Sequence, residues 1–152
     1  MDDNVKKKDD KFTIEKYKFG VSHEYSFIVE MKLYNIDLDN LNDYDQYSSV
    51  DFKIKNTDIY IELKTRMLNS FDYNTTLFDK SKCDIWDKKW SSKTIYICFY
   101  FIHDKQIKLI KYNNDKFNEF KTIYRNDWKT TNYLIPLTNC IDLLDFIADV
   151  LN

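Results

Sequence analysis

Glycine and proline are nearly absent from this 152-residue chain, which contains one of each and a single alanine. Arginine is also scarce, with two residues against 21 lysines, and glutamate occurs five times against 20 aspartates. Such a bias is expected from a very AT-rich genome, so the abundance of lysine and tyrosine gives little support for nucleic-acid contact. The net charge is −2, so no global field attracts a polyanion, and any such binding surface must be a local patch.

The three cysteines are odd in number and include no Cys-x-x-Cys pair, so neither a zinc knuckle nor a disulfide framework is indicated. An intracellular, reducing compartment fits this pattern. Residues 1–11 lack an apolar core, which predicts a disordered N-terminal end rather than a signal peptide. The apolar run Thr94–Ile102 is too short to span a bilayer and predicts a buried strand. The length predicts one domain, over residues 12–152.

Two short runs, Val50–Lys55 and Asp58–Lys64, alternate apolar with polar residues and flank Asn56 and Thr57. This pattern is typical of a β-hairpin, here with a two-residue loop. The apolar face of the predicted hairpin then consists of three opposed pairs: Val50 with Leu63, Phe52 with Ile61, and Ile54 with Ile59.

The polar face of the same hairpin places Asp51 opposite Glu62. Two carboxylates whose Cβ atoms lie about 5 Å apart repel each other unless a cation lies between them, and a divalent metal would satisfy both. Lys64 lies two residues beyond Glu62 on the same face, near enough to touch whatever the metal holds. The register therefore predicts a site with two acids and one lysine.

The acid-x-Lys pattern at Glu62 is not specific by itself, because it occurs seven times in the chain. Only the copy at Glu62 lies in an alternating strand with an acid directly opposite. The alternative interpretation is a solvated sheet face, on which a Glu-Lys pair stabilises by on the order of a few tenths of a kcal/mol.

Another glutamate lies on the apolar face of a helix predicted over residues 14–34. At about 100° per residue, Glu24 falls in the middle of the apolar stripe. Burying an unpaired carboxylate is expensive, so Glu24 needs a cation, a hydrogen-bond network or an edge position. The stripe is formed by Ile14, Tyr17, Val21, Tyr25, Ile28 and Met31.

A helix carrying Glu24, a strand carrying Asp51 and a strand reading Ile61-Glu62-Leu63-Lys64 together resemble the PD-(D/E)xK nuclease superfamily. Restriction enzymes, Holliday-junction resolvases and other small nucleases belong to this superfamily. The resemblance covers residues 20–66 directly and the rest of the chain by element order. Val50 stands where the family has the proline that names it.

The resemblance implies a restriction-endonuclease-like α/β sandwich, with a mixed central sheet flanked by helices in the order α-β-β-β-α-β-β-β-α. It implies that Asp51, Glu62, Lys64 and Glu24 are catalytic. Mg²⁺, for which Mn²⁺ is expected to substitute, would be held by Asp51, Glu62, the carbonyl of Leu63 and Glu24. Lys64 would orient or activate the attacking water and stabilise charge on the phosphate.

The segment Asp79–Trp90 predicts a short helix with lysines at both ends. In the resembling nucleases a helix at this place carries a lysine toward the site, which implies phosphate contacts from this helix. The alternative is a solvated, charged helix whose tryptophans pack on the core. The predicted substrate-binding residues are Lys82, Lys80, Lys53 and Arg66.

The rest of the chain predicts a scaffold. A polar loop is expected over Met67–Phe78 and a second hairpin over Thr94–Ile102 and Gln106–Tyr112. A further strand is expected over Asn132–Leu137, followed by an amphipathic helix over Asn139–Leu151.

Together these observations predict a Mg²⁺-dependent endonuclease that hydrolyses phosphodiester bonds of nucleic acid, with DNA favoured as the substrate. An RNA endonuclease of the same superfamily and a non-catalytic nuclease-fold module that binds nucleic acid or protein are the alternatives. An enzyme that makes two symmetric cuts needs two sites, so a homodimer is also expected. No membrane partner is expected.

Overall fold

The computed structural model describes residues 23–45 and 48–151. The chain forms two compact units, the first ending at Leu38 and the second spanning Asp39–Asn152. The predicted disordered end, residues 1–11, lies outside the described residues. None of the described helices is long and apolar enough to cross a membrane.

The first unit contains a helix over residues 23–33, inside the predicted range 14–34. Phe27 and Met31 are buried and lie one turn apart on one face. The helix ends at Leu33, and Asn35 just beyond it adopts a φ of 60° in the left-handed region. The carbonyl of Met31 accepts from the N–H of Tyr34 at 3.0 Å and from the N–H of Ile36 at 3.1 Å, which closes the end of the helix.

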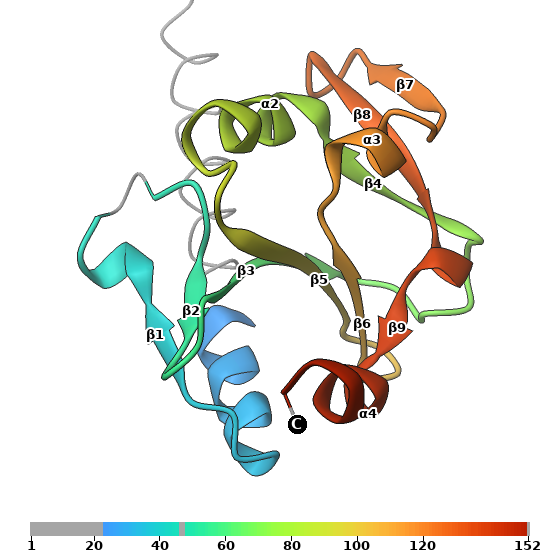
Figure 1. The fold of residues 1–152 in the computed structure, drawn as a ribbon. Helices are drawn as coiled ribbons and strands as arrows, with labels where there is room; N and C mark the ends of the chain where they lie inside the picture. Colours follow the sequence, from blue (N-terminus) through green and yellow to red (C-terminus); the bar gives the residue numbers. More distant parts are fainter. Residues whose placement is uncertain (1–22, 46–47, 152) are drawn as a thin grey trace, which may run out of the picture. The chain divides into compact units, whose positions relative to one another are not determined.

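The second unit is organised around a six-stranded mixed sheet of order β1-β2-β3-β5-β6-β9 (Figure 1). β3 and β5 are parallel, whereas the pairs β2–β3, β5–β6 and β6–β9 are antiparallel. The strands span Leu38–Asn40 (β1), Phe52–Ile54 (β2), Ile59–Arg66 (β3), Thr94–Phe101 (β5), Gln106–Lys111 (β6) and Ile141–Asp142 (β9).

A second, three-stranded antiparallel sheet has the order β4-β8-β7. Its strands span Thr75–Asp79 (β4), Thr130–Pro136 (β8) and Thr122–Arg125 (β7). The helices are α2 (Lys80–Lys89), α3 (Asn114–Phe117) and α4 (Leu143–Phe146), and α4 continues as a π-helix over Ile147–Leu151. Single 3₁₀ turns occur at Leu41–Asp43 and Leu137–Asn139.

The alternation of side chains along β5 shows what covers each face of the large sheet. Ile97 and its neighbours on one face belong to a core cluster with Trp86 of α2 and Ile135 of β8. On the other face, the ring of Tyr96 meets Phe146 of α4 edge to face, with centroids 5.0 Å apart. The large sheet is therefore covered by α2 and the small sheet on one face and by α4 on the other (Figure 1). The predicted mixed α/β sandwich is confirmed.

The predicted pairing of β2 with β3 is confirmed, because Phe52 pairs with Ile61 and Lys53 pairs with Tyr60. The connecting turn is longer than the predicted two residues, since β2 ends at Ile54 and β3 begins at Ile59. Two features close this wider turn. Asn56 adopts a φ of 63°, and the N–H and hydroxyl of Thr57 both donate to the carbonyl of Ile54.

Other expectations from the sequence need correction. The predicted loop Met67–Phe78 contains the beginning of β4, and β7 was not predicted. The predicted helix Asn139–Leu151 begins only at Leu143, because Ile141 first pairs with Leu109 of β6. The described residues form nine strands against six in the predicted order; β1, β4, β7 and β9 lie outside the ranges predicted as strands, and the short helix α3 was not predicted.

Candidate functional site

Asp51 is held against β3 by its side chain as well as by its backbone. Its Oδ2 accepts a hydrogen bond from the backbone N–H of Leu63 at 2.8 Å, and its Oδ1 accepts one from the side-chain amide of Asn42 at 3.2 Å. Its backbone N–H donates to the carbonyl of Ile61 at 3.1 Å, while its carbonyl accepts from Leu41 at 2.9 Å. The carboxylate thus takes the place of a main-chain acceptor where the regular ladder ends.

This change of pairing at Asp51 also explains why Val50 departs from its predicted place. Val50 was expected to face Leu63 on the apolar side of the hairpin, but it is fully buried in the core cluster that contains Trp86. The chain therefore turns toward α2 just before Asp51, and the predicted alternation holds only from Phe52 onward.

Glu62 lies in the middle of β3, beside Ile97 of β5, and only 2% of its surface is exposed. Two ammonium groups flank its carboxylate. Nζ of Lys82, from the first turn of α2, is 3.1 Å from Oε2, and Nζ of Lys64 is 4.0 Å from Oε1. The interpretation of this face as solvated is therefore wrong at Glu62, which is a buried acid held by two lysines.

The ionisation of Glu62 reflects a conflict among these charges. Burial and, after it, the charge of Asp51 raise the pKa of the Glu62 carboxyl, while Lys82 and Lys64 lower it, and the net pKa is about 8. Burial likewise lowers the pKa of the Lys64 amine, against the attraction of Glu62. Both changes disfavour the charged forms, because each group has lost water that would otherwise solvate it.

The position of Lys82 depends on how α2 is fixed. Asp79 caps the helix, since its Oδ1 accepts from the N–H of Ser81 at 2.9 Å. One turn after Lys82, the indole N–H of Trp86 donates to the carbonyl of Ser49 at 2.9 Å. This bond ties the helix that carries Lys82 directly to the segment leading into Asp51.

The other predicted substrate-binding residues make contacts elsewhere. Nζ of Lys80 lies 3.4 Å from Oδ1 of Asp84, on the exposed side of α2. Nζ of Lys53 lies 6.0 Å from the centroid of the Tyr60 ring. Of the four predicted lysines and arginines, Lys82 is the one for which the described residues show a contact with Glu62.

Arg66 links the two sheets. Its Nη2 donates to the carbonyl of Leu77 at 2.5 Å and its Nε donates to the hydroxyl of Thr76 at 3.2 Å, both in β4. Burial lowers the pKa of its guanidinium to about 10. Arg66 therefore has a structural contact that the sequence did not predict, and its predicted contact with substrate stays a prediction.

Glu24 is half-buried and lies in the helix described over residues 23–33. It belongs to the first unit, whereas Asp51, Glu62 and Lys64 belong to the second. The predicted role of Glu24 at the metal therefore stays a prediction.

The residues around Glu62 fit a hard divalent cation. No cluster of three or more histidine, cysteine, aspartate or glutamate side chains suited to a metal occurs among residues 23–45 and 48–151. The oxygen donors considered at this site are the carboxylates of Asp51 and Glu62 and the carbonyl of Leu63. Mg²⁺ is commonly held by one or two carboxylates, with waters and substrate phosphate completing its shell, so this donor set is sufficient.

Sequence reasoning missed Asn42. Its amide holds one oxygen of Asp51, and the 3₁₀ turn at Leu41–Asp43 brings it there. The surrounding polar segment has neither strand alternation nor helical periodicity, so no local signal places this amide beside a residue nine positions away.

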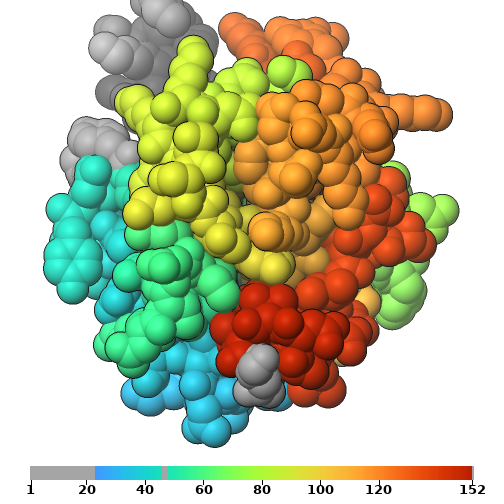
Figure 2. All heavy atoms as spheres, viewed as in Figure 1, coloured from blue at the N-terminus to red at the C-terminus, as the bar shows by residue number. Residues whose placement is uncertain are grey.

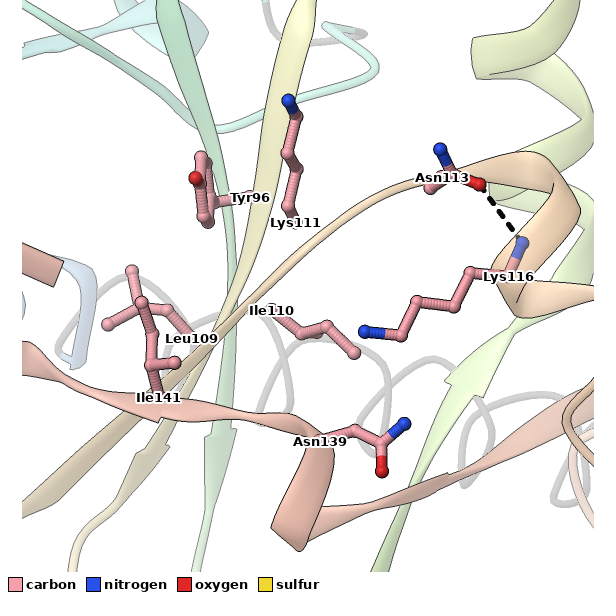
Figure 3. Close-up of a pocket in the computed structure, with 8 residues that line it drawn as sticks. All are labelled: Tyr96, Leu109, Ile110, Lys111, Asn113, Lys116, Asn139 and Ile141. Atoms are coloured by element: carbon pink, nitrogen blue, oxygen red, sulfur yellow. Dashed lines mark hydrogen bonds between the residues drawn. The ribbon is translucent and has the colours of Figure 1, made fainter. Parts of the chain in front are cut away.

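A separate hollow of about 420 Å³ lies beside β6 and β9 (Figure 3). Its lining includes Tyr96, Lys111, Asn113 and Asn139, and Lys116 extends its ammonium group across the space. Asn113 caps α3 by accepting from the N–H of Lys116 at 3.0 Å. The lining contains no acidic residue, so this hollow is not a candidate metal site.

Comparison with known proteins supports the fold. The sequence matches no protein family, and no curated protein matches it. Among solved structures, the fold is similar to that of a nuclease from a fusselovirus, with a TM-score of 0.52. The similarity covers 84% of this chain and 89% of that chain at 16% sequence identity. At this identity the likeness shows a shared arrangement of strands and helices.

Proposed function

We propose that this protein is a metal-dependent nuclease that hydrolyses phosphodiester bonds at Asp51, Glu62 and Lys64. The observation that carries the proposal is the buried carboxylate of Glu62, which lies between two lysines and beside a second acid. A buried acid that interacts with another acid is destabilising on its own, and such groups concentrate at functional sites. The fold similarity to a viral nuclease adds independent support.

Asp51 and Glu62 are the proposed metal ligands, with the carbonyl of Leu63 beside them. Asp51 is oriented for this task, because Leu63 and Asn42 each donate a hydrogen bond to one of its oxygens. Such outer hydrogen bonds fix the direction of a ligand. Mg²⁺ bound here would polarise the scissile phosphate and lower the pKa of a coordinated water.

Lys64 is proposed to act on the attacking water. Burial beside Phe78 lowers the pKa of its amine, against the opposing charge of Glu62, which brings the group closer to the range where it can accept and release a proton. Lys82 is proposed to hold Glu62 before metal binds and to face the substrate phosphate afterwards. Its place in the first turn of a capped helix favours both roles.

DNA is the favoured substrate, as the superfamily resemblance implies, and RNA is the competing one. The test is incubation of the purified protein with plasmid DNA, single-stranded DNA and RNA, each with Mg²⁺, Mn²⁺ or EDTA. We expect cleavage with either metal, none with EDTA, and a loss of at least 100-fold for Asp51→Asn and Lys64→Ala.

Matched controls come from the same chain. Asp58→Asn changes an exposed acid in the β2–β3 turn, and Lys111→Ala removes an exposed lysine of β6. Both variants should cleave like the wild type. Equal cleavage by Asp51→Asn and Asp58→Asn would refute the proposed site. Sedimentation of the active protein tests the expected homodimer.

A further inference from the structure

The hairpin of β7 and β8 carries an exposed aromatic surface. β7 is an edge strand of the small sheet, because it pairs with β8 alone. Ile123 and Tyr124 are 44% and 57% exposed. Successive strand residues point to opposite faces, so neither face of β7 is covered by the described residues. Trp128, in the connecting turn, is 46% exposed. We call the segment 121–130 the finger (Figures 1 and 2).

The charged side chains of the finger are arranged in two groups. Arg125 lies 4.1 Å from the centroid of the Trp128 ring and donates two hydrogen bonds to the carboxylate of Asp127. This arrangement orders the turn and neutralises its one acid. Lys121 and Lys129 are exposed and form no ion pair with the described residues. The finger thus combines ordered aromatic rings with two unpaired cations.

Strand register places the finger beside the first turn of α2. Asn132 of β8 pairs with Asp79 of β4 on one side and with Ile123 of β7 on the other. Beyond this level β4 ends, because Asp79 is the cap of α2, while β7 and β8 continue to the pair of Arg125 with Thr130. At about 3.3 Å per residue, the turn projects about 10 Å past the end of β4.

We propose that the finger binds unpaired nucleotides of a nucleic-acid substrate. This inference rests on the proposed nuclease function and names the class of substrate: strands with a single-stranded segment next to the site of cleavage. Tyr124 and Trp128 stack on bases, and Lys121 and Lys129 contact the phosphates on either side. Stacking on aromatic rings requires bases with an open face, which single strands offer and a closed duplex does not.

Charge and position favour this occupant. An edge strand with apolar side chains on both faces is prone to pair with another strand unless something covers or charges it. The unpaired cations at both ends of the finger complement a polyanion. The finger also lies at the end of the small sheet where α2 begins. Lys82, which contacts Glu62, is the third residue of that helix. A strand held by the finger therefore passes near the candidate site.

The test is fluorescence anisotropy with a labelled single-stranded DNA oligonucleotide and a blunt duplex of the same sequence, in EDTA so that no cleavage occurs. Tyr124→Ala and Trp128→Ala should each weaken binding of the single strand by roughly 5- to 100-fold, with duplex binding changed by less than about 2-fold. Trp128→Phe should restore most of the affinity. Phe71→Ala removes an aromatic that is 76% exposed outside the finger and should have no effect.

Several results would overturn the inference. They are an absence of single-strand binding by the wild type, unchanged binding by both alanine variants, and equal losses on duplex and single strand. A dimer that dissociates in Tyr124→Ala while single-strand binding is unchanged would identify a second copy of the chain as the occupant. Binding without metal is separate from cleavage. If the protein never cleaves but binds single strands in a Trp128-dependent way, the nuclease proposal is refuted and the inference about the finger stands. If the protein cleaves but its single-strand binding does not depend on Trp128, the inference about the finger is refuted and the nuclease proposal stands.

Discussion

Glu62 should make the stability of the metal-free protein depend on pH. Burial, together with the charge of Asp51, raises the pKa of its carboxyl from 4.5 to about 8 in the folded protein. A folded-state pKa above the unfolded value means that the native state binds the proton more tightly. The resulting stabilisation is fully present below about pH 4.5 and is lost as the pH rises toward 8. Replacing Glu62 by Gln removes this dependence, because the amide does not ionise.

The expected magnitude follows from the two pKa values. Between pH 5 and pH 8 the unfolded carboxyl is mostly ionised while the folded one keeps much of its proton, and linkage gives a loss of roughly 3–4 kcal/mol. The side chain is 2% exposed, so solvent screening reduces this value little. The free energy of unfolding of Glu62→Gln, relative to that of the wild type, should therefore increase by that amount between pH 5 and pH 8.

Urea unfolding in EDTA at pH 5, 6, 7 and 8, followed by tryptophan fluorescence, measures the difference. Glu119→Gln is the matched control, since Glu119 is exposed and belongs to another acid-x-Lys copy. Its stability should run parallel to the wild type at every pH. If the free energy of unfolding of Glu62→Gln also changed with pH in parallel with that of the wild type, the reasoning would be refuted. Such a result would mean that Glu62 ionises as readily in the folded protein as in the unfolded one.

Three further predictions concern the surrounding lysines and arginine. Lys82→Met should tighten Mn²⁺ binding by roughly 10-fold in calorimetry, because it removes an ammonium group 3.1 Å from the buried carboxylate. Lys80→Met should leave the affinity for Mn²⁺ unchanged, and weaker Mn²⁺ binding by Lys82→Met would contradict the prediction. Arg66→Met should lower the free energy of unfolding by about 2–3 kcal/mol, because the buried hydroxyl of Thr76 and the partly buried carbonyl of Leu77 lose a charged donor. A loss below about 1 kcal/mol would contradict this prediction. If the last turn of α2 contacts phosphates, the double variant Lys88→Gln with Lys89→Gln should flatten the slope of log affinity against log salt by nearly two units on duplex DNA. An unchanged slope would mean that these lysines do not contact the nucleic acid.

Local pattern was sufficient for the parts of the fold that depend on neighbouring residues. The alternation from Phe52 onward fixes which residues face Ile61 and Tyr60, so the pairing of β2 with β3 could be read from the sequence. Asp51 and Glu62 were predicted to approach each other for the same reason. The helix α2 was also predicted, since Trp86 and Trp90 recur at helical spacing, and it spans Lys80–Lys89 within the predicted range Asp79–Trp90.

Long-range packing determined what the sequence could not show. The burial of Glu62 follows from α2 lying over β3, and its 3.1 Å contact with Lys82 depends on that packing rather than on any spacing between the two residues. β9 is only two residues long and exists because Ile141 meets Leu109 of β6. β7 has no buried face, so its residues show no amphipathic alternation.

The most direct test of the central claim is anomalous diffraction from a crystal of the protein with bound Mn²⁺. The proposed nuclease requires a metal peak within about 2.5 Å of carboxylate oxygens from both Asp51 and Glu62, with Nζ of Lys82 moved away from Oε2 of Glu62. No peak at this position in crystals grown under conditions where the protein cleaves nucleic acid, or a peak bound by other residues, would contradict the account.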